Sequence, residues 1–229
     1  MTLKDEITQN ASDAFRKTWT ITEGRVVPRT DDIGLGNVGR KLDATVLYAD
    51  LADSTDMVRL KTATFAAEVY KTYLYAASRL IAAWDGTVTA FDGDRVMGVF
   101  LGGSKNSNAV KCALKLNWVV KYILQPELKM IYSDTDFVIR QKVGIDKSNI
   151  LVARTGIRGS NDLVWVGNAA NNAAKMAALD LGYSTYISGA IFGQIADDAK
   201  HSKGKNMWTG LGTSDLGYAV YGSRYWWSL

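Results

Sequence analysis

The sequence predicts an α+β fold of the ferredoxin-like kind, βαββαβ with extensions. Residues 42–51 (LDATVLYADL) form a nearly continuous apolar run rich in β-branched and aromatic side chains, which is typical of a buried strand. From there to about Trp84 the chain is rich in Ala, Leu and Tyr and contains no Pro or Gly, which predicts helix. Two strand-like segments then flank Asp92-Gly93, which is a turn signal.

The lead-in before this core is largely polar. Residues 5–19 predict an amphipathic helix, and the following stretch gathers Pro28 and several glycines, which indicates a loop. We therefore divide the chain into a lead-in at residues 1–40 and one domain at residues 41–229. The elements expected in that domain after the first strand are one long helix or two joined near Lys61–Thr64, strands at 86–94 and 95–102, a helix at 104–124 that ends before Pro126, strands at 137–146 and 149–155, a glycine-rich loop at 156–162, a short strand and helix at 163–180, a strand and helix at 183–195, and an aromatic strand in the tail at 217–229.

The composition excludes several kinds of site. One histidine, His201, and one cysteine, Cys112, are too few for a zinc site with the usual ligands, and His201 lies in a polar segment that does not suit a Ser-His-Asp triad. Cys112 has apolar neighbours in a helical pattern, so we expect an unreactive, packed thiol. The net charge of +4 is spread along the chain, which indicates a nucleic-acid surface only weakly.

The sequence also lacks signals for export or membrane insertion. No apolar run approaches the ~20 residues of a membrane helix, and the polar N-terminus lacks the apolar middle of a signal peptide. We therefore expect a cytoplasmic protein without a membrane partner.

Two aspartates carry the first chemical prediction. Asp50 ends the apolar strand, and Asp94 lies at the tip of the predicted hairpin. In a βαββ unit these two positions are neighbours, so the carboxylates should converge. Mg²⁺ and Mn²⁺ prefer such oxygen ligands, and a pair of these ions can activate a hydroxyl and stabilise a leaving oxygen. Taken singly, each aspartate is better explained as a helix cap or a turn residue, but the pair, together with the helix motif described below, favours a site.

The chain after Asp50 offers a second element of a phosphate site. Asp53-Ser54-Thr55-Asp56 is predicted to form the first turn of a helix. Such a turn presents free backbone N–H groups and the positive end of the helix dipole to a phosphate chain. Ser54 and Thr55 are therefore candidate substrate-binding residues.

A third segment, Gly167-Asn168-Ala169-Ala170-Asn171-Asn172-Ala173-Ala174-Lys175, predicts a helix from about Asn168. Asn171 and Lys175 are four residues apart and share one face of it. An amide and a cation on one face would suit a ribose and a phosphate. An ordinary amphipathic helix explains Lys175 as well, but the clustered asparagines are poor helix formers.

These three segments, in this order and spacing, resemble the catalytic domain of class III nucleotidyl cyclases. The family has an aspartate after a hydrophobic strand and a short run ending in Ser or Thr, matched by YADLADST with Asp50 and Thr55. It then has a Gly-Asp hairpin before an apolar strand, matched by DGDRVMGVF with Asp94. Later come a glycine and Asn-x-Ala-x-Arg, matched by GNAANNAAK. The agreement covers roughly residues 42–195.

The resemblance implies a nucleoside triphosphate substrate and a role for each motif. Asp50, Asp94 and the backbone carbonyl of Leu51 would hold two divalent ions, Mn²⁺ or Mg²⁺. Asn171 would orient the ribose, and Lys175, where the family usually has arginine, would stabilise charge on the α-phosphate. Family sites form between two subunits, so the resemblance also implies a homodimer with its sites at the interface.

The departures from the family bear on the base. Adenylate cyclases read adenine with a lysine and an aspartate at positions that are Ala90 and Val164 here, and neither residue pairs with a purine edge. Tyr48 and Arg95 flank the metal aspartates and are candidate readers of a smaller base. Their ordinary alternatives are a core tyrosine and an exposed hairpin charge.

This pattern is similar to the pyrimidine cyclases of bacterial Pycsar antiphage systems, which make cyclic UMP or cyclic CMP. The similarity implies a uridylate or cytidylate cyclase whose product is a second messenger for antiphage defence. Arg224, in YGSRYW, is the candidate for binding the polyphosphate.

Three alternatives stay open from the sequence. The first is a cyclase with purine specificity, and the second is an inactive cyclase fold that binds nucleotides or dimerises. The third is a ferredoxin-like RNA-binding domain, which the pI of 9.0 and seven tryptophans allow. The last has no use for Asp50 and Asp94, which repel phosphate unless a metal is present, so we expect no nucleic-acid partner.

Overall fold

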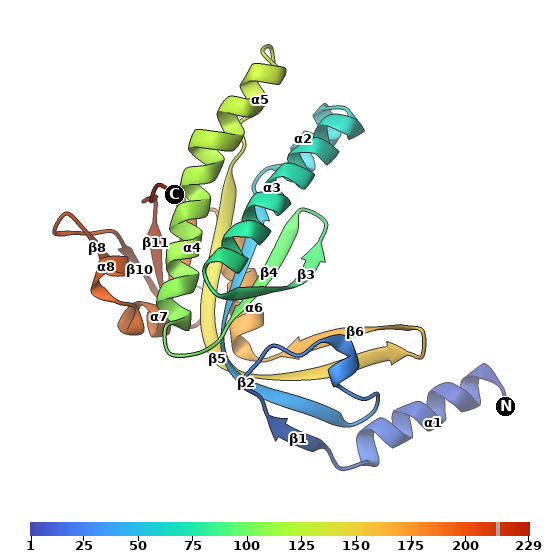
Figure 1. Cartoon of the computed structure of the whole chain (residues 1–229). Coiled ribbons are helices and arrows are strands. Elements are labelled where there is room, and N and C mark those ends of the chain that lie inside the picture. Colours follow the sequence, from blue (N-terminus) through green and yellow to red (C-terminus); the bar gives the residue numbers. More distant parts are fainter. Residues whose placement is uncertain (214–215) are drawn as a thin grey trace.

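A mixed β-sheet runs through the centre of the fold, and helices cover both of its faces (Figure 1). The computed structural model describes residues 1–213 and 216–229. Its helical segments are α1 (Leu3–Arg16), η1 (Thr30–Asp32), α2 (Ser54–Leu60), α3 (Ala63–Ala83), α4 (Lys105–Val119), η2 (Val120–Leu124), α5 (Gln125–Ile131), α6 (Asn168–Ala177), α7 (Gly189–Gln194) and α8 (Asp197–Lys200). Its strands are β1 (Thr20–Glu23), β2 (Val38–Leu51), β3 (Gly86–Asp92), β4 (Arg95–Phe100), β5 (Gln141–Ile157), β6 (Ser160–Val166), β7 (Thr185–Ser188), β8 (His201–Ser202), β9 (Lys205–Asn206), β10 (Thr209–Thr213) and β11 (Ala219–Ser223).

The centre of the sheet confirms the predicted ferredoxin-like order. The strands run β10-β11-β7-β5-β2-β4-β3, with β1 pairing to β2 and β6 to β5. Its β5-β2-β4-β3 portion is the sheet of a βαββαβ unit, in which β2 pairs antiparallel with both β4 and β5. The end of β2 therefore lies between the β3–β4 hairpin and the start of β5.

Alternation along β2 divides the sheet into two faces. Leu47, Ala49 and Leu51 pack into the large core beneath α3 and α4. Val46 belongs to a second core cluster and Tyr48 packs against it, on the opposite face, which α6 partly covers. We call this second face the site face, because Asp50 follows Tyr48 by two residues and lies on it.

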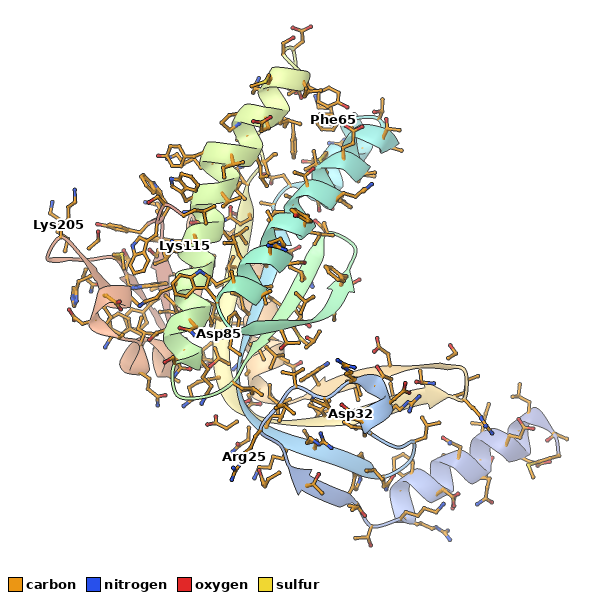
Figure 2. All side chains as sticks on the ribbon, viewed as in Figure 1. Arg25, Asp32, Phe65, Asp85, Lys115 and Lys205 are labelled. Carbon is orange, nitrogen blue, oxygen red and sulfur yellow. The ribbon has the colours of Figure 1, made fainter. Side chains whose placement is uncertain are left out.

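The helical stretch that ends near Trp84 consists of two helices, α2 and α3, rather than one long helix. They join at residues 61–62, within the predicted join at Lys61–Thr64. The hydroxyl of Thr62 caps α3 by accepting from the backbone N–H of Phe65. Figure 2 shows Phe65 near the ends of α3 and α5, where its ring meets that of Tyr132 edge-on at 4.9 Å.

The prediction that the 104–124 helix ends before Pro126 is wrong. Helical structure continues through the π-helical turn η2 into α5 and ends at Ile131. In this turn the N–H of Gln125 bonds to the carbonyl of Val120, five residues back. Pro126 then falls in the first turn of α5, where a missing N–H costs little.

The predicted strands at 137–146 and 149–155 are one strand, β5, and residues 137–140 precede it. Its pairing with β2 runs without a shift from Gln141 opposite Leu51 to Ala153 opposite Gly39. Lys147 and Ser148, which lie between the two predicted strands, are part of β5, and Ser148 Oγ accepts a hydrogen bond from the N–H of Ala169 in α6. The predicted loop at 156–162 is too long, because residues 156–157 and 160–162 are paired strand and only residues 158–159 form the turn of the β5–β6 hairpin. Strand β2 begins at Val38 rather than at 42.

Cys112 is fully enclosed in the large core, and burial raises the pKa of its thiol far above the ordinary value. We expect native protein to react with a thiol reagent at least about a hundredfold more slowly than unfolded protein, because labelling requires opening of the core. A timed reaction with Ellman's reagent, with and without urea, measures this. Equal rates in the two states would contradict the packing described here.

None of the helices in the described residues is long and apolar enough to cross a membrane.

Candidate active site

Asp50 lies near the end of β2 with its carboxylate mostly buried. Arg95, the first residue of β4, is its partner across the strands and donates from Nη2 to Asp50 Oδ2 at 3.1 Å. The Asp50 side chain keeps 17% of its exposure and the Arg95 side chain keeps 34%. Burial raises the pKa of the Asp50 carboxyl, the charge and hydrogen bond of Arg95 lower it, and the charge of Asp94 raises it. Asp50 is thus a desolvated carboxylate with a second negative charge nearby.

Asp94 sits in the two-residue turn between β3 and β4, after Gly93 with φ +60°. Its Oδ2 is buried and accepts no hydrogen bond from the part of the chain that the structure describes. A buried carboxylate oxygen without a donor is costly unless a cation satisfies it.

This pair fits a divalent-metal site on its donor chemistry. Residues 1–213 and 216–229 contain no group of three or more His, Cys, Asp or Glu side chains placed to hold a metal. Mg²⁺ commonly binds one or two carboxylates and completes its shell with water and substrate phosphates, and Mn²⁺ suits the same oxygen donors. Asp50, Asp94 and the carbonyl at Leu51 would form such a partial oxygen set.

Tyr48 and Arg95 lie together on the site face. Tyr48 is half-buried, and burial raises the pKa of its hydroxyl while the charge of Arg95 lowers it. Tyr48 packs against the second core cluster, as a strand tyrosine ordinarily does. Arg95 is not the freely exposed hairpin charge considered above, because Asp50 holds its guanidinium.

The residues after β2 form a tight entry into α2. Asp53 adopts φ 60°, makes no side-chain cap, and pairs instead with Arg140 at 2.7 Å. Ser54 is the first residue of α2 and is partly exposed, and Thr55 is exposed. The side chain of Asp53 therefore leaves the first amides of this seven-residue helix uncapped.

Asn171 and Lys175 occupy the exposed face of α6, as their spacing predicts. The opposite face buries five residues, namely Ala169, Ala170, Ala173, Met176 and Ala177. Within the described residues, no hydrogen bond or ion pair joins Asn171 or Lys175 to Asp50 or Asp94. A single chain therefore does not link the two sets of candidate residues by direct contacts.

Neither of the two positions that would carry the adenine-reading residues offers a polar side chain. Ala90 on β3 packs against the second core cluster. Val164 on β6 keeps 37% of its exposure and offers no polar atom beyond its backbone.

Arg224, just after β11, lines a cleft of about 530 Å³ near the ends of β2 and β5. Its Nε donates to the carbonyl of Gly182 at 2.6 Å, and its guanidinium lies 4.5 Å from the ring centre of Tyr183. We call this the cationic cleft, because four of its lining residues are basic and two are acidic: Lys121, Arg140, Lys142, Arg224, Asp53 and Asp180. Asp50 does not line it.

Known proteins resemble this chain over its whole length, although no family model matches it. A uridylate cyclase from Xanthomonas perforans is 49% identical over 209 residues, which cover 91% of this chain and 90% of that protein. A uridylate cyclase from Burkholderia cepacia is 45% identical over the full length of both. The chain belongs to the uridylate cyclase family. The crystal structure of the adenylyl cyclase CyaB from P. aeruginosa shares the fold, with a TM-score of 0.67 at 19% identity over 81% of this chain and 95% of that one.

For a member of the uridylate cyclase family, Lys142 is a further candidate site residue, which the sequence did not reveal. It lies directly opposite Asp50 on β5, so Arg95 and Lys142 flank that carboxylate from the two neighbouring strands. Its ammonium group pairs with Asp180 at 3.0 Å and also lines the cationic cleft. Only the pairing register of strands far apart in sequence brings Lys142 to Asp50, so no local signal marked it.

Proposed function

We propose that this protein converts UTP to 3′,5′-cyclic UMP and pyrophosphate. The observation that carries the proposal is the placement of Asp50 near the end of β2 and of Asp94 in the adjacent β3–β4 turn, in a chain that matches uridylate cyclases over its full length. In the reaction the 3′ oxygen bonds to the α-phosphorus and the bond to the bridging oxygen of pyrophosphate breaks. The 3′ hydroxyl loses its proton, so the products are the cyclic ester, pyrophosphate and one proton.

Asp50, Asp94 and the carbonyl of Leu51 are the proposed ligands of two divalent ions, Mn²⁺ or Mg²⁺. Bound there, the ions would lower the pKa of the 3′ hydroxyl and stabilise charge on the leaving oxygen. The buried Oδ2 of Asp94, which has no hydrogen-bond partner in the part of the chain that the structure describes, supports this assignment. Arg95 must then share Asp50 with a cation, which would free its guanidinium for the substrate.

The second half of the site comes, in this proposal, from another copy of the chain. Asn171 of the partner subunit would orient the ribose, and Lys175 of the partner subunit would stabilise charge on the α-phosphate. Both side chains are exposed and unengaged within the described residues, which supports a role toward a second molecule. The resulting homodimer has two equivalent sites.

Recognition of the base and the phosphates falls to the remaining candidates. Tyr48 and Arg95 would recognise the pyrimidine by hydrogen bonds to its polar edge. The side chains of Ala90 and Val164 are apolar and cannot make such hydrogen bonds. Lys142 and Arg224 would bind the phosphate chain where the cationic cleft opens beside β2, with the amides near Ser54 and Thr55. CTP is the alternative substrate, since both bases are of one size.

The proposal extends to the biological setting by resemblance. The product would serve as a second messenger for antiphage defence in the cytoplasm, with residues 41–229 as the catalytic domain and residues 1–40 as its lead-in.

Incubation of the pure protein with ATP, GTP, CTP and UTP, each with Mn²⁺, tests the proposal. We expect mass spectrometry to find cyclic UMP as the main product. Heat-treated protein and reactions with excess chelator serve as controls. Cyclic AMP or cyclic GMP as the main product would overturn the proposed base readers, and no product from any triphosphate would favour a nucleotide-binding module.

A further inference from the structure

Helix α6 is fixed to β5 by contacts at alternate residues of that strand. Ser148 Oγ accepts the N–H of Ala169 at 3.0 Å at the start of the helix. Toward the other end, Gly144 lets the backbone approach so closely that a Cβ there would lie 2.1 Å from the carbonyl oxygen of Ala173. Asp146 lies between these two on the same face of the strand, because side chains alternate.

Asp146 is a buried carboxylate to which the proposed chemistry assigns no role. It keeps only 4% of its exposure. Its Oδ2 accepts from Asn172 Nδ2 at 2.8 Å, and its Oδ1 accepts from Ser188 Oγ at 2.5 Å. No Lys, Arg or His side chain within the described residues forms an ion pair with it. Two neutral donors therefore stabilise this charge, and loss of either would be costly.

The partner Asn172 lies on α6 between the buried face of the helix and the exposed face that carries Asn171 and Lys175. It follows Asn171 directly and precedes Lys175 by three positions. Successive helix residues are about 100° apart, so an inward anchor at Asn172 sets where its neighbours point. The remaining buried contacts of α6 are mostly alanines, whose small side chains resist rotation of the helix only weakly.

We propose that Asp146 is a positioning residue, which through Asn172 sets the rotation of α6 and so aims Asn171 and Lys175 at the substrate. This inference rests on the proposed function, because it requires α6 to contribute to the active site. Ser188 holds the other carboxylate oxygen and also caps α7 by accepting from Ile191, so the anchor is itself fixed to the sheet.

Asn172→Asp tests the anchor, because two carboxylates then face each other in a buried site. We expect kcat to fall about 10²-fold, as for a misplacement of about 1 Å of reacting groups, with KM for UTP changed much less. The double variant Asp146→Asn with Asn172→Asp restores one donor opposite one acceptor and should regain most of the lost kcat. Asn10→Asp makes the same charge change on exposed α1 and should leave kcat unchanged.

Mixing of variants shows which half of the site is affected. Asn172→Asp with Asp50→Ala should regain activity, because the heterodimer has one site with intact aspartates and an intact α6. Asn172→Asp with Asn171→Ala should stay inactive, because both chains then have a defective α6. Where Asn172→Asp does not fold, Asn172→Leu removes the donor with a side chain of similar size, and the same results are expected.

The outcomes distinguish this inference from the proposed function. If Asp50→Ala mixed with Asn171→Ala stays inactive while heterodimers form, the shared site itself is wrong. If that mixture is active but the Asn172 variant is fully active alone, or fails to complement Asp50→Ala, the positioning role is wrong. A double variant that folds and stays as inactive as the single one also overturns it.

Discussion

Replacing Asp50 or Asp94 with alanine is expected to abolish cyclisation while leaving a folded protein. Each carboxylate is a proposed metal ligand, and loss of preorganised charge stabilisation of this kind lowers kcat by roughly 10³-fold or more. Folding should persist, because Asp94 Oδ2 accepts no hydrogen bond from residues 1–213 or 216–229, and Asp50 contributes one partly exposed ion pair. Product formation from UTP, thermal melting and the molecular mass in solution are measured together.

The same variants test whether two chains share a site. An equal mixture of Asp50→Ala with Asn171→Ala should recover about a quarter of wild-type activity, since half of the dimers are mixed and each has one intact site. The unmixed variants are the controls. Recovery requires that subunits exchange, which a tagged copy co-purifying with an untagged one establishes. Mixed dimers that remain inactive would contradict the shared site.

Replacing Gly144 with alanine is expected to be among the most destabilising single changes in this chain. The added Cβ would lie 2.1 Å from the carbonyl oxygen of Ala173 and 2.7 Å from the backbone nitrogen of Ala177. Both atoms belong to the backbone of α6, so no side-chain rotation relieves the clash, and the helix must move away from the sheet. We expect the free energy of unfolding to fall by roughly 3 kcal/mol or more, at the upper end for overpacking.

Urea denaturation monitored by circular dichroism measures this loss. Gly103→Ala is a matched control, because a Cβ at Gly103 has no atom within 4 Å and the backbone there is compatible with alanine. That variant should unfold at nearly the wild-type urea concentration. A Gly144→Ala protein as stable as the control would show that α6 lies farther from β5 than described here. Any stable Gly144→Ala protein should also lose activity, because α6 carries Asn171 and Lys175.

Local chemistry in the sequence was enough to place several elements of the site. The apolar run into Asp50 and the turn at Asp92-Gly93 are short-range signals, and the strand and the hairpin that they predict are present. The four-residue spacing of Asn171 and Lys175 likewise placed both on one exposed helix face. These features depend on neighbours along the chain, which a single sequence displays directly.

Other features depend on which segments meet in space. Residues 147 and 148 separate the two predicted strands, yet β5 continues through them, and Asp146 and Ser148 bond to α6. Pro126 indicates a helix end, but the π-helical turn before it places it where no N–H is required. In both cases a tertiary or backbone arrangement satisfies groups that appear unsatisfied when the sequence is considered alone.

The sequence by itself determined the fold class, the placement of Asp50 near a strand end and of Asp94 in the neighbouring hairpin turn, and the resemblance of three motifs to nucleotide cyclases. Tertiary structure alone decided that Arg95 holds Asp50, that Lys142 lies opposite that carboxylate, and that Asn172 rather than Asn171 faces Asp146. The physical reason is register. Periodicity indicates which residues share a face of a strand or helix. Which side chains come within hydrogen-bonding distance depends on the pairing of β2 with β4 and β5 and on the packing of α6 against β5.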